Sequence, residues 1–153
     1  MGAATEYYIP LLHPLVVHFP IVLLLVAAGM VVIWSVRDRD GWLRMACGFA
    51  WLGSVAAVVA SRTGEQLEEE VRGTPMVETL IDLHELSADW TVLLAFCLSL
   101  VLTTLLFGAR WWPNRAGSPG AIRLLVLLLA IAVAVLIAWT GHLGGLMVWG
   151  VPR

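Results

Sequence analysis

Residues 13–34 read HPLVVHFPIVLLLVAAGMVVIW, a long apolar run that opens with two histidines and two prolines. A helix that crosses the ~30 Å hydrocarbon core of a bilayer needs about 20 apolar residues, and the run from about Leu15 to Trp34 supplies them. Pro14 and Pro20 fall in the first turns, where proline costs least or produces a kink. The stretch therefore predicts a membrane-spanning helix with histidines at one end.

The composition of the whole chain is that of a membrane protein. Of its 153 residues, 60% are hydrophobic and 13% are charged, whereas soluble domains are roughly 45–50% apolar and about 25% charged. The net charge of −2 disfavours nucleic acid as a partner, and no nucleophile elbow or phosphate loop supports hydrolytic or transfer chemistry. Cys47 and Cys97 lie in apolar runs and are expected to be buried free thiols.

Three further apolar runs follow, so the sequence predicts an all-α membrane protein. Its four transmembrane helices should form an up-down-up-down bundle, in a single domain covering residues 1–153. No basic segment precedes the first run and no small-residue cleavage site follows it, so it is expected to be a retained span rather than a signal peptide. The predicted spans are residues 15–34, 42–61, 88–107 and 122–141.

The arginines set the expected orientation, because cytoplasmic loops carry an excess of basic residues. One predicted side carries Arg37, Arg39, Arg44, Arg110, Arg115 and Arg123, and the other carries Arg62, Arg72 and Arg153. The first side is therefore expected to be cytoplasmic, in a multi-pass protein of the bacterial inner (plasma) membrane with both termini periplasmic. Trp34 and Trp42 are expected at the cytoplasmic interface, as part of an aromatic belt.

The four histidines of the chain are all predicted to lie at the periplasmic end. His13 and His18 begin the first span, His84 precedes the third, and His142 follows the fourth. His84 falls on the apolar side of its predicted helix, opposite an acidic stripe; that stripe consists of Glu78, Asp82, Glu85 and Asp89. Ionisable residues at membrane depth generally face the bundle interior, so a histidine cluster is predicted there.

A weak internal echo suggests two hairpins of similar plan. Thr63-Gly64-Glu65 at the end of the second span resembles Thr140-Gly141-His142 at the end of the fourth, which would match Glu65 with His142. Small residues recur along both spans, at Ala50, Gly53, Ala57, Ser61 and Gly64, and at Ala130, Ala134, Ala138 and Gly141. Such a line is typical of close helix packing, or it leaves room for a flat cofactor; packing is favoured.

A b-type heme is the first functional interpretation of the histidines. Heme iron takes two axial imidazoles, which bundle proteins supply from facing helices, and His18, His84 and His142 are on separate helices at nearly one depth. His13 would be a further ligand or a supporting histidine. Arg62 and Arg72 would pair with the heme propionates, or instead with the neighbouring glutamates. This interpretation favours an electron-transfer subunit of a larger respiratory or photosynthetic complex over a catalyst.

Two alternatives remain open. His18, His84 and His142, with Glu65, would hold copper, zinc or non-heme iron directly, although no tight spacing such as His-x-x-x-His supports this. The chain would otherwise be a non-redox accessory or structural subunit, whose acidic periplasmic face docks other membrane subunits or a periplasmic electron carrier. The histidines would then be interface residues that hydrogen-bond carbonyls or lipid headgroups.

The opening and closing motifs resemble a known family. His13-Pro14-x-x-Val17-His18-Phe19-Pro20-Ile21 and the closing stretch Gly141-His142-Leu143-Gly144-Gly145 are similar to those of the bacterial predicted membrane proteins called domain of unknown function 2231. The resemblance covers nearly the whole chain and implies a four-helix membrane protein. Some members are fused to cytochrome c-like domains, which implies a redox setting. The matched motifs carry His13, His18 and His142, but not His84.

Overall fold

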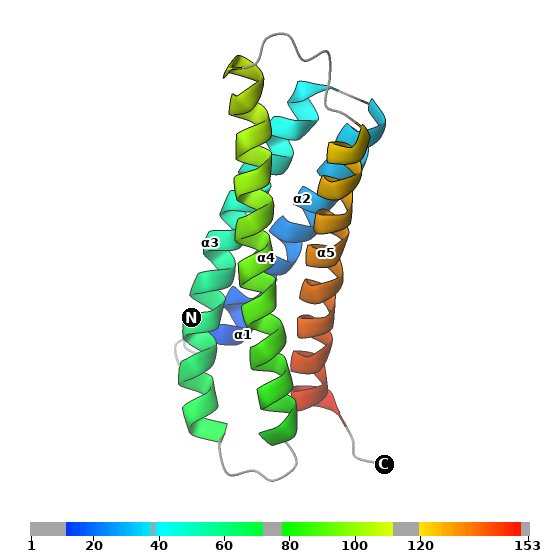
Figure 1. The fold of residues 1–153 in the computed structure, drawn as a ribbon. Helices are drawn as coiled ribbons and strands as arrows, with labels where there is room; N and C mark the ends of the chain where they lie inside the picture. The colour runs from blue at the N-terminus through cyan, green and yellow to red at the C-terminus, as the bar shows by residue number, and fades with distance from the viewer. Residues whose placement is uncertain (1–11, 38, 72–77, 112–119, 151–153) are drawn as a thin grey trace, which may run out of the picture.

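Four long helices run up and down in one bundle (Figure 1). The computed structural model describes residues 12–37, 39–71, 78–111 and 120–150. The helices are α1 (His13–Val16), α2 (His18–Arg37), α3 (Asp40–Val71), α4 (Glu78–Trp111) and α5 (Gly120–Trp149). Neighbouring pairs are α2 with α3, α3 with α4, α4 with α5 and α5 with α2. The predicted all-α, four-span fold is confirmed.

The first span is interrupted near its outer end by proline. Pro20 has no N–H to donate to the carbonyl one turn earlier, at Val16, so the helical ladder lapses there and α1 is separated from α2. The flanking bonds persist, from Val17 N to His13 O at 3.0 Å and from Ile21 N to Val17 O at 3.4 Å. The result is a short helix that carries His13 at the end of the first span.

The helices extend beyond the predicted spans. The segments apolar enough to cross a membrane are His13–Arg37, Asp40–Glu65, Glu78–Gly108 and Gly120–Trp149. The largest differences are in α3, which continues into the polar stretch after Ser61 and ends at Val71, and in α4, which already begins at Glu78. Hydropathy marks where lipid ends, whereas a helix continues as long as its backbone hydrogen bonds do, so the two boundaries need not coincide.

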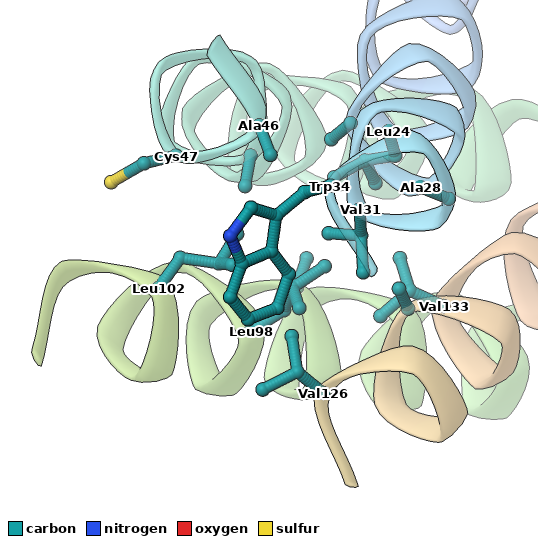
Figure 2. Packing of buried hydrophobic residues seen from close by; sticks show 14 of the residues in the cluster. Leu24, Ala28, Val31, Trp34, Ala46, Cys47, Leu98, Leu102, Val126 and Val133 are labelled. Atoms are coloured by element: carbon teal, nitrogen blue, oxygen red, sulfur yellow. The ribbon is translucent and has the colours of Figure 1, made fainter. Parts of the chain in front are cut away.

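The hydrophobic core lies between the four long helices, around Trp34 (Figure 2). This indole is 2% exposed and lies among Ala46 of α3, Leu98 and Leu102 of α4, and Val126 of α5. The sequence predicted Trp34 as an interfacial belt residue; the structure instead buries it between helices. Cys47 and Cys97 are both free, as expected, but only Cys47 is buried, whereas Cys97 is partly exposed.

Buried hydroxyls link α4 to its two neighbours. Ser99 lies 3.1 Å from Ser54 of α3, and Thr140 of α5 donates to Ser87 at 3.1 Å and lies 3.3 Å from Thr91. Hydrogen bonds between helices help to hold membrane bundles together, because moving an apolar side chain from lipid into the bundle gains little free energy. One stripe of α4 therefore supplies polar contacts to both α3 and α5.

The two hairpins are internal repeats, but in a different register from the predicted one. At one constant offset, most buried positions of α3 correspond to buried positions of α5, and at another most buried positions of α2 correspond to buried positions of α4. Ala46, Ala50, Gly53, Ala57 and Ala60 match Val126, Ala130, Val133, Ile137 and Thr140; Pro20, Leu24, Ala27, Ala28 and Val31 match Thr91, Ala95, Leu98, Ser99 and Leu102. Gly64 thus corresponds to Gly144, and the predicted match of Gly64 with Gly141 is wrong.

The line of small residues follows the core along α3 but only part of α5. A Cβ added at Gly53 would lie 2.7 Å from Leu24 Cδ2, so this glycine lets α2 approach α3. On α5 the predicted line departs from the core, since Ala138 and Gly141 are exposed. The core side of α5 instead carries Ala130, Val133, Ile137 and Thr140.

Candidate functional site

His13 lies on α1 and packs against the outer part of α3. Its Nδ1 is 3.0 Å from the carbonyl oxygen of Ala60 and 3.2 Å from Oγ1 of Thr63, whose own hydroxyl donates to the same carbonyl. Because a carbonyl only accepts, the proton of the neutral ring is assigned to Nδ1. Nε2 then keeps its lone pair for another partner.

His84 occupies the equivalent place in the second hairpin, on α4 against α5. Its ring is half-buried while Glu78, Asp82, Glu85 and Asp89 are exposed, so the predicted orientation of His84 away from the acidic stripe is confirmed. The backbone of Thr140 faces the ring, but within the described residues Nδ1 is buried without a hydrogen bond of good geometry. The second imidazole is therefore the less constrained of the two.

Each of these imidazoles rests on a glycine. A Cβ added at Gly64 would lie 3.1 Å from Cε1 of His13, and one added at Gly144 would lie 3.3 Å from Cε1 of His84. Any side chain larger than hydrogen would press on the ring at both positions. The glycines thus let the two rings lie close to the α3 and α5 backbones, and the repeat places them in corresponding positions.

The bundle brings the two rings together. The ring centroids of His13 and His84 are 6.5 Å apart, and their planes are inclined at 83°. One imidazole comes from each hairpin, at the end of the bundle where α1 lies. The pair is the closest approach between histidines that the structure records for the described part of the chain.

The other two histidines point elsewhere. His18 and His142 are both exposed, and the ring of His142 lies 5.7 Å from that of Trp139 on its own helix. Neither has a recorded contact with the His13–His84 pair. The structure therefore brings together His13, which the opening motif indicated, and His84, which was indicated only by its place on the apolar side of its predicted helix.

The predicted propionate partners are placed only in part. Arg62 forms an ion pair with Glu65 at 3.1 Å, and both side chains are largely exposed. This is the alternative pairing with a neighbouring glutamate. Arg72 lies outside the described residues.

No larger metal-ligand group is present in the part of the chain that the structure describes. There, no three side chains of His, Cys, Asp or Glu are grouped so that they could hold a metal ion. His18, His84, His142 and Glu65 therefore do not converge on one bare ion. Among the described residues, the histidines whose rings lie close together are His13 and His84.

A groove lies beside the pair, between α3 and α4. It has a volume of about 640 Å³. Its α3 wall includes Ser61, Arg62 and Glu65, which alternate along the helix with the residues that contact His13. Neither His13 nor His84 lines it.

The family model called predicted membrane protein DUF2231 matches residues 9–151. The chain belongs to this family. The resemblance carried by the opening and closing motifs is thereby confirmed. No curated protein and no solved structure matches the chain. For a DUF2231 protein the family itself supplies no reaction, so function has to be argued from the site.

Sequence reasoning missed the glycines that support the imidazoles in this DUF2231 protein. It treated Gly64 as one of a packing line and gave Gly144 no role. The signal was present in the spacing, because Ala60 precedes Gly64 as Thr140 precedes Gly144. This spacing was obscured because the Thr63-Gly64 dipeptide also matches the Thr140-Gly141 dipeptide.

Proposed function

We propose that this chain is an integral membrane protein that binds b-type heme through His13 and His84 and transfers electrons. The observation that carries the proposal is the close approach of two imidazoles, one from each hairpin. With metal–nitrogen bonds of roughly 2.0–2.1 Å, two imidazoles on opposite sides of one ion have centroids about 6 Å apart. The 6.5 Å between His13 and His84 is close to that spacing, and rotation about such an axis allows perpendicular planes.

The hydrogen bond of His13 also supports a ligand role. Metal-bound histidines usually donate their second ring N–H to a carbonyl or carboxylate, which fixes the tautomer and the ring orientation. The bond from Nδ1 to the Ala60 carbonyl does this at 3.0 Å and leaves Nε2 free to bind iron. Gly64 packs behind the same ring.

The number of ligands favours heme over a bare ion. Zinc in a protein takes three or four protein ligands, and the described residues offer no such group. Heme iron already has four porphyrin nitrogens and takes only axial ligands from the protein. His13 and His84 would hold the heme, and a heme held by two imidazoles would supply electron transfer rather than oxygen chemistry. The porphyrin would require the outer turns of the two hairpins to separate around it.

The proposal places the protein in the bacterial inner membrane, with the histidine pair on the periplasmic side, and makes it a subunit of a respiratory or photosynthetic complex. The support is the distribution of arginine and the four apolar helices. Large apolar side chains such as Val36, Phe107 and Leu125 are 62–79% exposed, and these surfaces contact lipid. Its electron partner would be another membrane subunit or a periplasmic carrier.

Heme content of the purified protein tests the proposal. The wild-type chain, extracted in mild detergent, is expected to contain about one heme per chain by pyridine hemochrome assay, because one imidazole pair holds one iron. It should show a sharp α-band on reduction with dithionite. A colourless, helical protein that stays heme-free when expressed with excess heme would contradict the proposal.

The second candidate is a non-redox accessory subunit, and one observation favours it. His13 is already hydrogen-bonded to Ala60 and packed on Gly64, so it also serves to join α1 to α3. In that case His13→Ala would lower the stability of the purified protein or of its complex without any change in visible absorbance. The two candidates are thus separated by the same spectrum.

A further inference from the structure

The groove between α3 and α4 is amphipathic along its length. Toward the polar end of the helices it is lined by Ser61, Arg62, Glu65 and Asp89. Further into the membrane span it is lined by Val58, Val92, Leu93 and Phe96. It has a volume of about 640 Å³ and is open to its surroundings rather than enclosed. The groove therefore suits a molecule with a polar head and an apolar tail.

The charges at the polar end select the kind of head. Nη1 of Arg62 donates to both carboxylate oxygens of Glu65, at 3.1 and 3.2 Å, so these two charges largely neutralise each other. Asp89 forms no ion pair within the described residues. The rim thus carries an excess of carboxylate, which repels a phosphate headgroup and accepts a hydrogen bond from a neutral hydroxyl.

The apolar wall suits a ring with a hydrocarbon tail. Phe96 is half-buried and is held edge-on against Trp51, with ring centroids 5.9 Å apart. Phe96 lines the groove, and an aromatic ring held in place packs well against a planar ligand. Leu93, which is 51% exposed, lies at the outer edge of the groove, where a tail would continue into the bilayer.

We propose that this groove binds the ring of a quinol or quinone, with its hydroxyl on Asp89 and its tail along the seam of α3 and α4. A quinol or quinone would be the substrate of the proposed electron-transfer protein. That the bound molecule exchanges electrons with the protein rests on the proposed function. The groove lies next to the imidazole pair, since Ser61 and Arg62 lie between Ala60 and Thr63, which both contact His13. Binding itself requires no heme.

The test is a titration of decylubiquinone and its reduced form into the full-length protein in phosphatidylcholine nanodiscs, followed by quenching of tryptophan fluorescence. Saturable quenching is expected for the wild type. Leu93→Phe should fill part of the groove and weaken the apparent affinity for the quinone by about tenfold. That is the effect expected when the ligand loses the burial of one or two apolar groups. Leu100→Phe is the matched control, because Leu100 is 53% exposed on the same face of α4 but outside the groove.

The hydroxyl contact is tested by a second matched pair. Asp89→Asn should weaken binding of the reduced form by about tenfold, as expected for a lost hydrogen bond to a charged group, and affect the oxidised form less. Glu85→Gln, on the same exposed stripe but outside the groove, should change neither.

Equal quenching in the wild type, Leu93→Phe and Leu100→Phe would show partition into the bilayer and overturn the inference. Loss of saturable quenching when phosphatidylglycerol is added to the nanodiscs would assign the groove to lipid, and would also overturn it. Saturable binding to a protein that stays heme-free when expressed with excess heme would keep the inference and reject the proposed heme. A heme-loaded protein that binds no quinone would do the reverse.

Discussion

At the scale of single residues, the site depends on two glycines as much as on two histidines. A Cβ added at Gly64 or Gly144 would come closer to the ring of His13 or His84 than ordinary van der Waals contact allows. The rings are therefore positioned largely by the backbones of α3 and α5, with the Thr63 hydroxyl as a further contact of His13. A methyl group at either glycine is the smallest change that tests this arrangement.

The adjacent pair Gly144 and Gly145 offers such a test. Gly145→Ala should stabilise the protein by about 0.5–1 kcal/mol, because alanine loses less backbone entropy in a helix and the new methyl group meets nothing within 4 Å. Gly144→Ala should gain less or lose stability, because its methyl group presses on His84. Thermal unfolding in detergent gives both values. Equal gains for the two variants would contradict the packing of His84 on α5.

At the scale of the helices, the bundle is held by hydroxyls on one stripe of α4. Thr140→Val should remove the link from α5 to Ser87 and Thr91 and cost about 0.6 kcal/mol, with an upper limit of about 1.7 kcal/mol. Thr104→Val is the control, because Thr104 is exposed and bonds only to Val101 on its own helix. Denaturation in mixed micelles measures both. If Thr104→Val loses as much stability as Thr140→Val, the hydroxyl contacts between α4 and α5 do not account for the loss.

The same scale explains what the sequence could predict. On the outer turns of α4 an acidic stripe distinguishes the two faces, so the orientation of His84 was predictable. Along α1 and α2, apart from the histidines, almost every residue is apolar. Lipid and the core both accept apolar side chains, so no pattern marks the face that is turned toward the bundle. For that reason the sequence could not distinguish His13, which faces the bundle, from His18, which is exposed.

At the scale of the whole molecule, two similar hairpins form a four-membered ring of helices and place one histidine each at the same end. Hydropathy predicted the four spans, and the common end of the histidines followed from them. The register of the repeat could not be predicted from matching letters, because it is defined by which positions are buried. Pairing His13 with His84 required the packing of α1 on α3 and of α4 on α5.

Orientation in the membrane is a prediction about the whole molecule. Alkaline phosphatase fused after Arg153 should be active in a bacterial host, because the arginine-rich loops are expected to stay in the cytoplasm and the C-terminus to face the periplasm. The same fusion with green fluorescent protein, exported in unfolded form, should be dark. The opposite pair of results would place the histidine pair on the cytoplasmic side.

The most direct test of the central claim compares the four single variants His13→Ala, His18→Ala, His84→Ala and His142→Ala in their heme content and reduced-minus-oxidised spectra. Each is checked for helical content and monodispersity, so that misfolding is not mistaken for ligand loss. His13→Ala and His84→Ala are expected to lose heme or its bis-imidazole low-spin spectrum, while His18→Ala and His142→Ala keep both. A wild-type spectrum in His13→Ala or His84→Ala, or loss of heme confined to His18→Ala and His142→Ala, would contradict the account.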